Sequence, residues 1–119
     1  MDEMQALVDS LTLELRRGTL VLSVLSQLSQ PRYGYSLVQR LEERGISIEP
    51  GTLYPLLRRL ERQQLLQSSW ETSGAKPRKY YVRTEHGDRV YAILYQQWSN
   101  MVAHMESLTS EGGNRDAHQ

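Results

Sequence analysis

The sequence predicts a mostly α-helical fold with one small β-hairpin, and three observations support this. Apolar residues recur at intervals of three and four along much of the 119-residue chain, as they do on the buried faces of helices. Residues 68–83 instead combine β-preferring residues with a cluster of turn formers, which is typical of a hairpin. The final third carries a long stripe of large apolar residues with coiled-coil-like spacing. At this length we expect one domain with a dependent extension.

The charges are concentrated in the middle of the chain. The formal net charge is zero, yet residues 32–89 carry eleven Lys or Arg against seven Asp or Glu. Twelve of the fourteen cations are Arg, which favours bidentate contacts with phosphate or guanine. The chain has no Cys, so disulfides and thiolate metal sites are excluded. Apolar runs are too short to span a bilayer and no signal-peptide pattern opens the chain, so we expect a cytoplasmic protein with no membrane partner.

The N-terminal part contains one or two helices. A narrow apolar stripe at intervals of four predicts a helix over residues 4–15, and its members are Leu7, Leu11 and Leu15. Gly18 interrupts this pattern, and Thr19 is a plausible N-cap for a second, buried helix over residues 20–28. A single bent helix over residues 4–29 is the alternative.

The middle of the chain predicts two more helices. After a connector at residues 29–34, a helix over residues 35–44 ends at Gly45 in the left-handed conformation. Residues 46–48 alternate in polarity, as in one short strand. A helix over residues 50–64 then leads into the first strand of the hairpin.

The hairpin and a long last helix complete the chain. Strands over residues 68–71 and 78–83 flank a turn-forming segment with a basic tip. Thr84 is expected to cap a helix that runs to about Thr109. Residues 110–119 are polar, contain two glycines and are expected to be disordered.

The helix over residues 50–64 is strongly two-sided. At about 100° per residue, one side gathers four leucines: Leu53, Leu56, Leu57 and Leu60. The opposite arc gathers small and cationic residues: Gly51, Pro55, Arg58, Arg59 and Arg62. Small residues allow a close approach to base edges, and arginines can bind guanine or phosphate. Taken alone, the pattern also fits an ordinary surface helix with solvated arginines.

The neighbouring segments favour a nucleic-acid surface. The helix over residues 35–44 precedes the two-sided helix after a short link, in the layout of a helix-turn-helix. The hairpin that follows brings a basic set: Lys76, Arg78, Lys79 and Arg83. A charged hairpin alone would be unremarkable, but helix, helix and basic hairpin in this order are more specific than any one of them.

Several motifs resemble the PadR family of winged-helix transcriptional regulators. They are Gly18-Thr19-Leu20, Tyr33-Gly34-Tyr35, Pro50-Gly51-Thr52-Leu53-Tyr54-Pro55, Arg78-Lys79-Tyr80-Tyr81, and Thr84 with Gly87. The match covers roughly residues 16–100. The short C-terminal part resembles the smaller subfamily, which has one long helix after the wing. Residue 49 is commonly a small polar capping residue in the family, whereas Glu49 stands here.

The resemblance implies a homodimeric repressor that binds double-stranded DNA at a palindromic operator. The implied organisation is an N-terminal dimerisation helix at residues 1–17, a winged helix-turn-helix at residues 18–84 and a dimerisation helix at residues 85–109, with the tail at residues 110–119. The helix pattern and the resemblance together predict these DNA-binding residues: Gly51, Thr52, Tyr54, Pro55, Arg58, Arg62, Lys76, Arg78 and Lys79.

Two apolar stripes have no place in a winged-helix core, and pairing them across two chains would bury both. One is the Leu7, Leu11 and Leu15 stripe, and the other comprises Leu94, Trp98, Met101, Val102, Met105 and Leu108. Some members of the small subfamily bind flat effectors between aromatic residues of the long helix. Trp98 and Tyr95 are therefore candidate binding residues for a small aromatic effector. The alternative is a tryptophan that only packs in the interface.

No catalytic or metal-binding constellation is evident, so we expect no enzyme and no cofactor. The three histidines are scattered, and no phosphate-binding glycine loop occurs. The rival function is a protein-interaction adaptor that uses the winged-helix shape without reading DNA.

Overall fold

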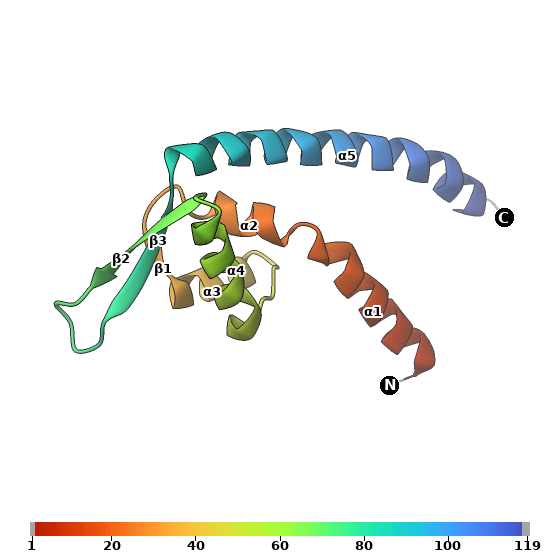
Figure 1. The fold of residues 1–119 in the computed structure, drawn as a ribbon. Coiled ribbons are helices and arrows are strands. Elements are labelled where there is room, and N and C mark those ends of the chain that lie inside the picture. Colours follow the sequence, from red (N-terminus) through yellow and green to blue (C-terminus); the bar gives the residue numbers. More distant parts are fainter. Residues whose placement is uncertain (1, 118–119) are drawn as a thin grey trace.

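The computed structural model describes residues 2–117 and shows a mostly α-helical fold with a small antiparallel sheet. The elements are α1 (Glu3–Arg17), α2 (Leu20–Ser26), β1 (Arg32–Tyr33), α3 (Gly34–Glu43), α4 (Pro50–Arg62), β2 (Leu66–Glu71), β3 (Arg78–Arg83) and α5 (Glu85–Ala117). Helices α2, α3 and α4 and the sheet form a compact unit, from which α1 and α5 project as two diverging arms (Figure 1). The predicted fold class is confirmed.

The core lies between α2, α3, α4 and the base of the sheet. Its fully enclosed side chains are almost all leucines, namely Leu25, Leu28, Leu37, Leu53, Leu57, Leu60 and Leu66, with Val24. Three of them come from α4, so the expected leucine face is the one that docks this helix. The opposite face of α4 is left in solvent.

The N-terminal region forms two helices, not one. Helix α1 ends at Arg17, and α2 starts at Leu20 after Gly18 and Thr19. The predicted side-chain cap of Thr19 was wrong, because its hydroxyl donates 2.8 Å back to the Arg16 carbonyl. The backbone carbonyl of Thr19 instead accepts the N–H of Ser23 at 2.9 Å.

The sheet has three strands in the order β1-β3-β2. The predicted hairpin is confirmed, with Trp70 opposite Lys79 and Glu71 opposite Arg78. Arg32 and Tyr33 were expected in a connector, but they pair with the second edge of β3. Residues 46–48 were expected to form a strand and do not. They connect α3 to α4 without pairing to the sheet, and Ile48 packs into the core.

The start of α5 is fixed against the end of α4. Thr84 Oγ1 accepts the N–H of Gly87 at 2.8 Å, as expected of a cap, and donates to the Gln64 carbonyl at 2.7 Å. A Cβ on Gly87 would overlap the carbonyl oxygen of Leu65. Helix α5 runs past Thr109 to Ala117, so residues 110–117 are helical and not the expected disordered tail, whose residues 118–119 lie outside the described part. Each glycine in a helix costs only about 1 kcal/mol, which a long helix tolerates.

Candidate nucleic-acid interface

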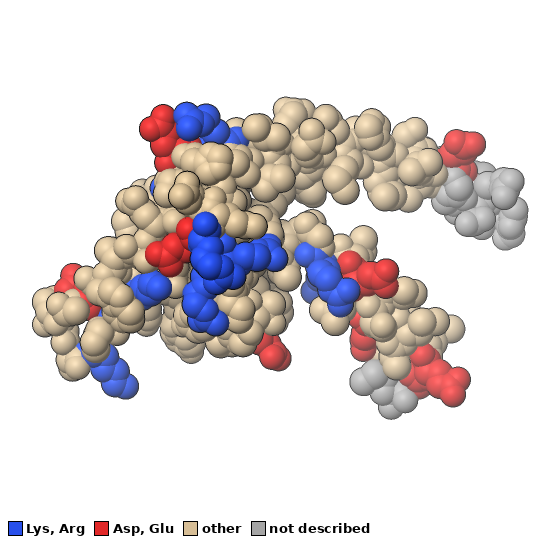
Figure 2. Space-filling view, in the orientation of Figure 1, with Lys and Arg blue, Asp and Glu red and all other residues tan. Residues whose placement is uncertain are grey.

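The solvent-facing side of α4 is cationic. Gly51, Thr52 and Pro55 are exposed near its start, and Arg58, Arg59 and Arg62 are exposed beyond them. Figure 2 shows their positive charge gathered over α4, in the middle of one face of the molecule. No acidic side chain lies within ion-pair distance of these three arginines in the described residues, so they are available to bind an anion.

Tyr54 lies at the edge of this face and is half-buried. Its ring packs over Gly34 at the start of α3, where a Cβ would overlap the ring. Burial raises the pKa of the Tyr54 hydroxyl, and the nearby hydroxyl groups of Tyr33, Tyr81 and Tyr35 raise it further. Tyr54 therefore joins α3 to α4 as well as bordering the predicted DNA surface.

Helix α4 begins without a side-chain cap. Glu49 stands at the N-cap position, and its carboxylate accepts no capping hydrogen bond. Its backbone carbonyl accepts the N–H groups of Thr52 and Leu53, each at 2.9 Å. A small polar side chain at position 49, as is common in the family, would accept a hydrogen bond from an N-terminal N–H of α4. Glu49 makes no such hydrogen bond.

The wing, which is β2, β3 and the turn between them, carries its cations on two different faces. The guanidinium of Arg78 lies 4.7 Å from the ring centre of Tyr33, on the side where β1 pairs. The ammonium of Lys79 faces α4 instead, 3.5 Å from a carboxylate oxygen of Glu61 and 5.3 Å from the ring centre of Tyr81. Lys76 is exposed in the turn. The structure thus brings Arg78 and Lys76 into solvent and draws Lys79 towards the helix.

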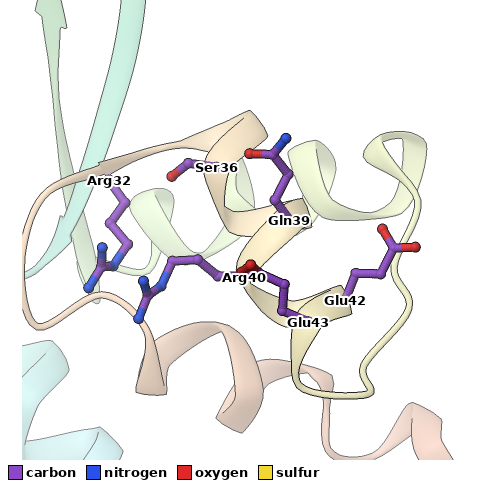
Figure 3. Close-up of a pocket in the computed structure, with 6 residues that line it drawn as sticks. All are labelled: Arg32, Ser36, Gln39, Arg40, Glu42 and Glu43. Carbon is purple, nitrogen blue, oxygen red and sulfur yellow. The ribbon is translucent and has the colours of Figure 1, made fainter.

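A further pair of arginines lies on the other side of the helix-turn-helix. Arg32 of β1 and Arg40 of α3 extend next to each other in a cleft that Glu42 and Glu43 also line (Figure 3). Arg32 Nε donates 2.8 Å to the Gln27 carbonyl, and Arg40 Nε donates 3.2 Å to the Gln27 side chain. Both arginines therefore tie β1 and α3 to the end of α2, a role that the sequence did not reveal.

Known proteins share this architecture. The family model for the transcriptional regulator PadR-like family matches residues 21–93. The chain belongs to this PadR-like family of transcriptional regulators. A crystal structure of a PadR family transcriptional regulator from Eggerthella lenta is 52% identical with a TM-score of 0.85, covering 88% of this chain and 94% of that one. A PadR-like transcription factor from Bacteroides fragilis is 31% identical with a TM-score of 0.69, covering 83% and 98% of the two chains.

A curated relative agrees. A transcriptional regulator of Mycobacterium tuberculosis is 35% identical over 75 residues, which cover 62% of this chain and 70% of that protein. PadR-family regulators bind DNA, are typically dimeric and are not enzymes. In the described residues no group of three His, Cys, Asp or Glu side chains could hold a metal ion. No helix there is long and apolar enough to cross a membrane.

The arms of this PadR-like chain expose the two apolar stripes. On α1 the exposed members are Leu7, Leu11 and Leu15, and on α5 they are Trp98, Met101, Met105 and Leu108, whereas Leu94 and Val102 are half-buried. Trp98 and Tyr95 have ring centres 5.9 Å apart. Two clefts of about 310 and 380 Å³ lie between α2 and α5, and Trp98 lines both of them. The candidate effector residues thus border real concavities within one chain.

Proposed function

We propose that the protein is a sequence-specific regulator that binds double-stranded DNA as a homodimer. The observation that carries the proposal is the exposed arginine face of α4, with the basic wing beside it. Its small N-terminal residues suit close approach to base edges, and Arg58 and Arg62 suit guanine or phosphate. Gly51, Thr52, Tyr54 and Pro55 complete the surface on α4. A regulator of this kind acts on DNA in the cytoplasm.

The homodimer follows from the exposed stripes on α1 and α5. Side chains such as Leu15, which is 78% exposed, and Leu108, which is 65% exposed, are costly to leave in water along a continuous stripe. A second copy offers the same stripes, and packing α1 of each chain against α5 of the other would bury both. A two-fold dimer reads a palindromic operator. Bound at such an operator, the dimer would exclude other proteins from the DNA and so act as a repressor.

The test is selection of duplexes from a random pool, followed by affinity measurements over a range of salt concentrations. We expect a palindromic site whose affinity falls steeply with salt, because phosphate contacts release counterions. Arg58→Ala should weaken binding about tenfold or more, as expected for a lost base or phosphate contact. Arg89→Ala is the control, since Arg89 lies on α5 and pairs with Glu85. Equal affinity for the wild type and Arg58→Ala would contradict the assignment of the surface.

The adaptor hypothesis predicts a different result. A winged helix that only binds proteins would select no duplex sequence, even at low salt. Its arginine face would then serve an acidic protein partner, and Arg58→Ala would weaken that complex.

A small aromatic effector is a second proposal, supported by the clefts beside Trp98 and Tyr95. Planar aromatic compounds titrated into the protein should quench Trp98 and release DNA. Trp70 is 62% exposed and contributes background, so the titration is best done in a Trp70→Phe protein. Trp98→Leu should abolish the response. If binding persists in Trp98→Leu, the effector site lies elsewhere.

A further inference from the structure

The cationic face of α4 continues into a cleft on the flank away from the wing. Arg17, the last residue of α1, borders a cleft of about 470 Å³ together with Arg59 and Arg62 of α4. The remaining lining is apolar or small: Leu20, Val21, Thr52, Pro55 and Leu56. Residues of α1, α2 and α4 therefore line one concavity, whose arginines come from α1 and α4.

The arginines of this cleft form no ion pair in the described residues. No acidic residue of the described part of the chain lines the cleft. Figure 2 shows the cations at the end of α1 beside those of α4 on the same face of the molecule. Arginines that are held near one another without counter-charges suit a polyanion.

The position of the cleft relative to the wing is the deciding feature. One flank of α4 carries Tyr54 and Glu61, and Glu61 contacts Ser68 and Lys79 of the wing. At about 100° per residue, Thr52 and Leu56 lie on the other flank, facing the cleft. A helix about 10 Å across in a major groove about 12 Å wide has a phosphate backbone on each side. The wing is suited to one of these backbones, and the cleft is placed beside the other.

We propose that Arg17, with Arg59, binds the phosphate backbone on the side of α4 opposite the wing. The ligand is the DNA backbone itself, so the contact contributes affinity and register without reading sequence. The proposal rests on the proposed function, since it requires α4 to lie in the major groove. It assigns a DNA contact to α1, a helix whose stripe otherwise serves only the dimer.

The experiment compares Arg17→Gln with Arg16→Gln in the full chain on its selected operator. Arg16 precedes Arg17 in α1, is exposed and does not border the cleft. The slope of log affinity against log salt should become shallower by about 0.9 for each Arg17 lost, or about 1.8 for a dimer. Binding should weaken by a similar factor, several-fold or more, on operator and random DNA. Arg16→Gln should match the wild type, and Arg17→Lys should keep the slope.

Each outcome decides the matter. An unchanged slope in Arg17→Gln, or equal changes in both glutamine variants, overturns the backbone contact. If the wild type binds no duplex, the proposed function is overturned as well. If Arg58→Ala loses DNA binding while Arg17→Gln binds like the wild type, only the backbone contact of Arg17 is overturned. Sedimentation shows whether each variant keeps the wild-type assembly. If Arg17→Gln does not, Arg59→Gln provides the same measurement from α4.

Discussion

At the scale of single residues, two glycines allow backbone and side chains to meet without a Cβ between them. Gly34 lies under the ring of Tyr54, and Gly87 lies on the carbonyl of Leu65. The first contact joins the two helices of the helix-turn-helix, and the second joins the winged-helix unit to α5. The motifs that suggested the family contain both glycines, but only the packing shows why a side chain is excluded there.

Gly87→Ala should destabilise the protein by about 3 kcal/mol or more, because the new methyl group meets backbone that cannot rotate away. Gly18→Ala is the matched control, because nothing lies within 4 Å of its Cβ position and its φ is −69°. The control should be neutral or stabilising by up to about 1 kcal/mol. Urea unfolding at one protein concentration measures both. Similar midpoints for the two variants would contradict the predicted overlap.

Tyr54 gives the folded protein a pH dependence at the alkaline end. Its pKa is raised above the ordinary value of about 10, mainly by burial, so the native state holds this proton when the unfolded chain has released it. The stabilisation is complete below about pH 10 and is lost as the pH rises through the raised pKa. Tyr54→Phe should flatten the fall in unfolding free energy as the pH rises above about 10. A profile that this substitution leaves unchanged would contradict the prediction.

At the scale of elements, the wing is anchored to α4 by a contact between Lys79 and Glu61. The pair is about one-third exposed on both sides, with side-chain accessibilities of 30% and 34%. A pair of this kind contributes about 0.5 kcal/mol or less to stability, so its main effect is to orient the wing. Arg78 points to the opposite face, where it lies over Tyr33.

We therefore expect the two neighbouring cations of β3 to differ in their DNA binding. Arg78→Gln should make the salt dependence shallower by about 0.9 per protomer, because a phosphate contact is lost. Lys79→Gln should weaken binding with little change in slope, and Glu61→Gln should do the same. The double variant Glu61→Gln/Lys79→Gln should bind DNA no more weakly than either single variant. A slope change in Lys79→Gln as large as that in Arg78→Gln would show that both lysine and arginine reach phosphate.

The helices and strands also differ in how well they could be predicted from the sequence. The helices and the hairpin follow from apolar spacing and turn formers, so their order was predicted correctly. Strand β1 was missed because two residues, Arg32 and Tyr33, give no periodicity, and only the free edge of β3 makes them a strand. Gln64 adopts a left-handed φ of 65° after α4 without the glycine that usually signals it. The direction of Lys79 was equally hidden, because it depends on the position of Glu61 in space.

At the scale of the whole molecule, the chain consists of a small compact unit and two long arms. The extents of 63 × 37 × 22 Å reflect these arms, which carry most of the exposed large apolar side chains. A winged helix of this size has a marginal core on its own. Much of the stability of the protein should therefore come from association.

Met105→Glu should convert the dimer to a monomer, because it places a charge within the stripe of α5, where Met105 is 54% exposed in the single chain. Ser107→Glu is the matched control, since it adds the same charge on the opposite side of the helix, also exposed. Sedimentation velocity at micromolar concentration distinguishes the two states. A wild-type protein that sediments as a stable monomer would refute the dimer outright.

The direct contact between the start of α5 and the residues that follow α4 has a consequence for the operator. Thr84 donates hydrogen bonds to the carbonyls of Gln64 and Leu65, at 2.7 and 3.1 Å, and Gly87 packs against the second. The start of α5 is therefore fixed directly to the residues that follow α4. In a dimer joined through α5, the angle between the two long helices would fix the distance between the two α4 helices. One inserted base pair turns a half-site by about 35°. Because a rigid junction prevents the two α4 helices from rotating to follow the half-site, the DNA would have to twist instead. The loss of affinity caused by such insertions would therefore measure how rigid the junction is.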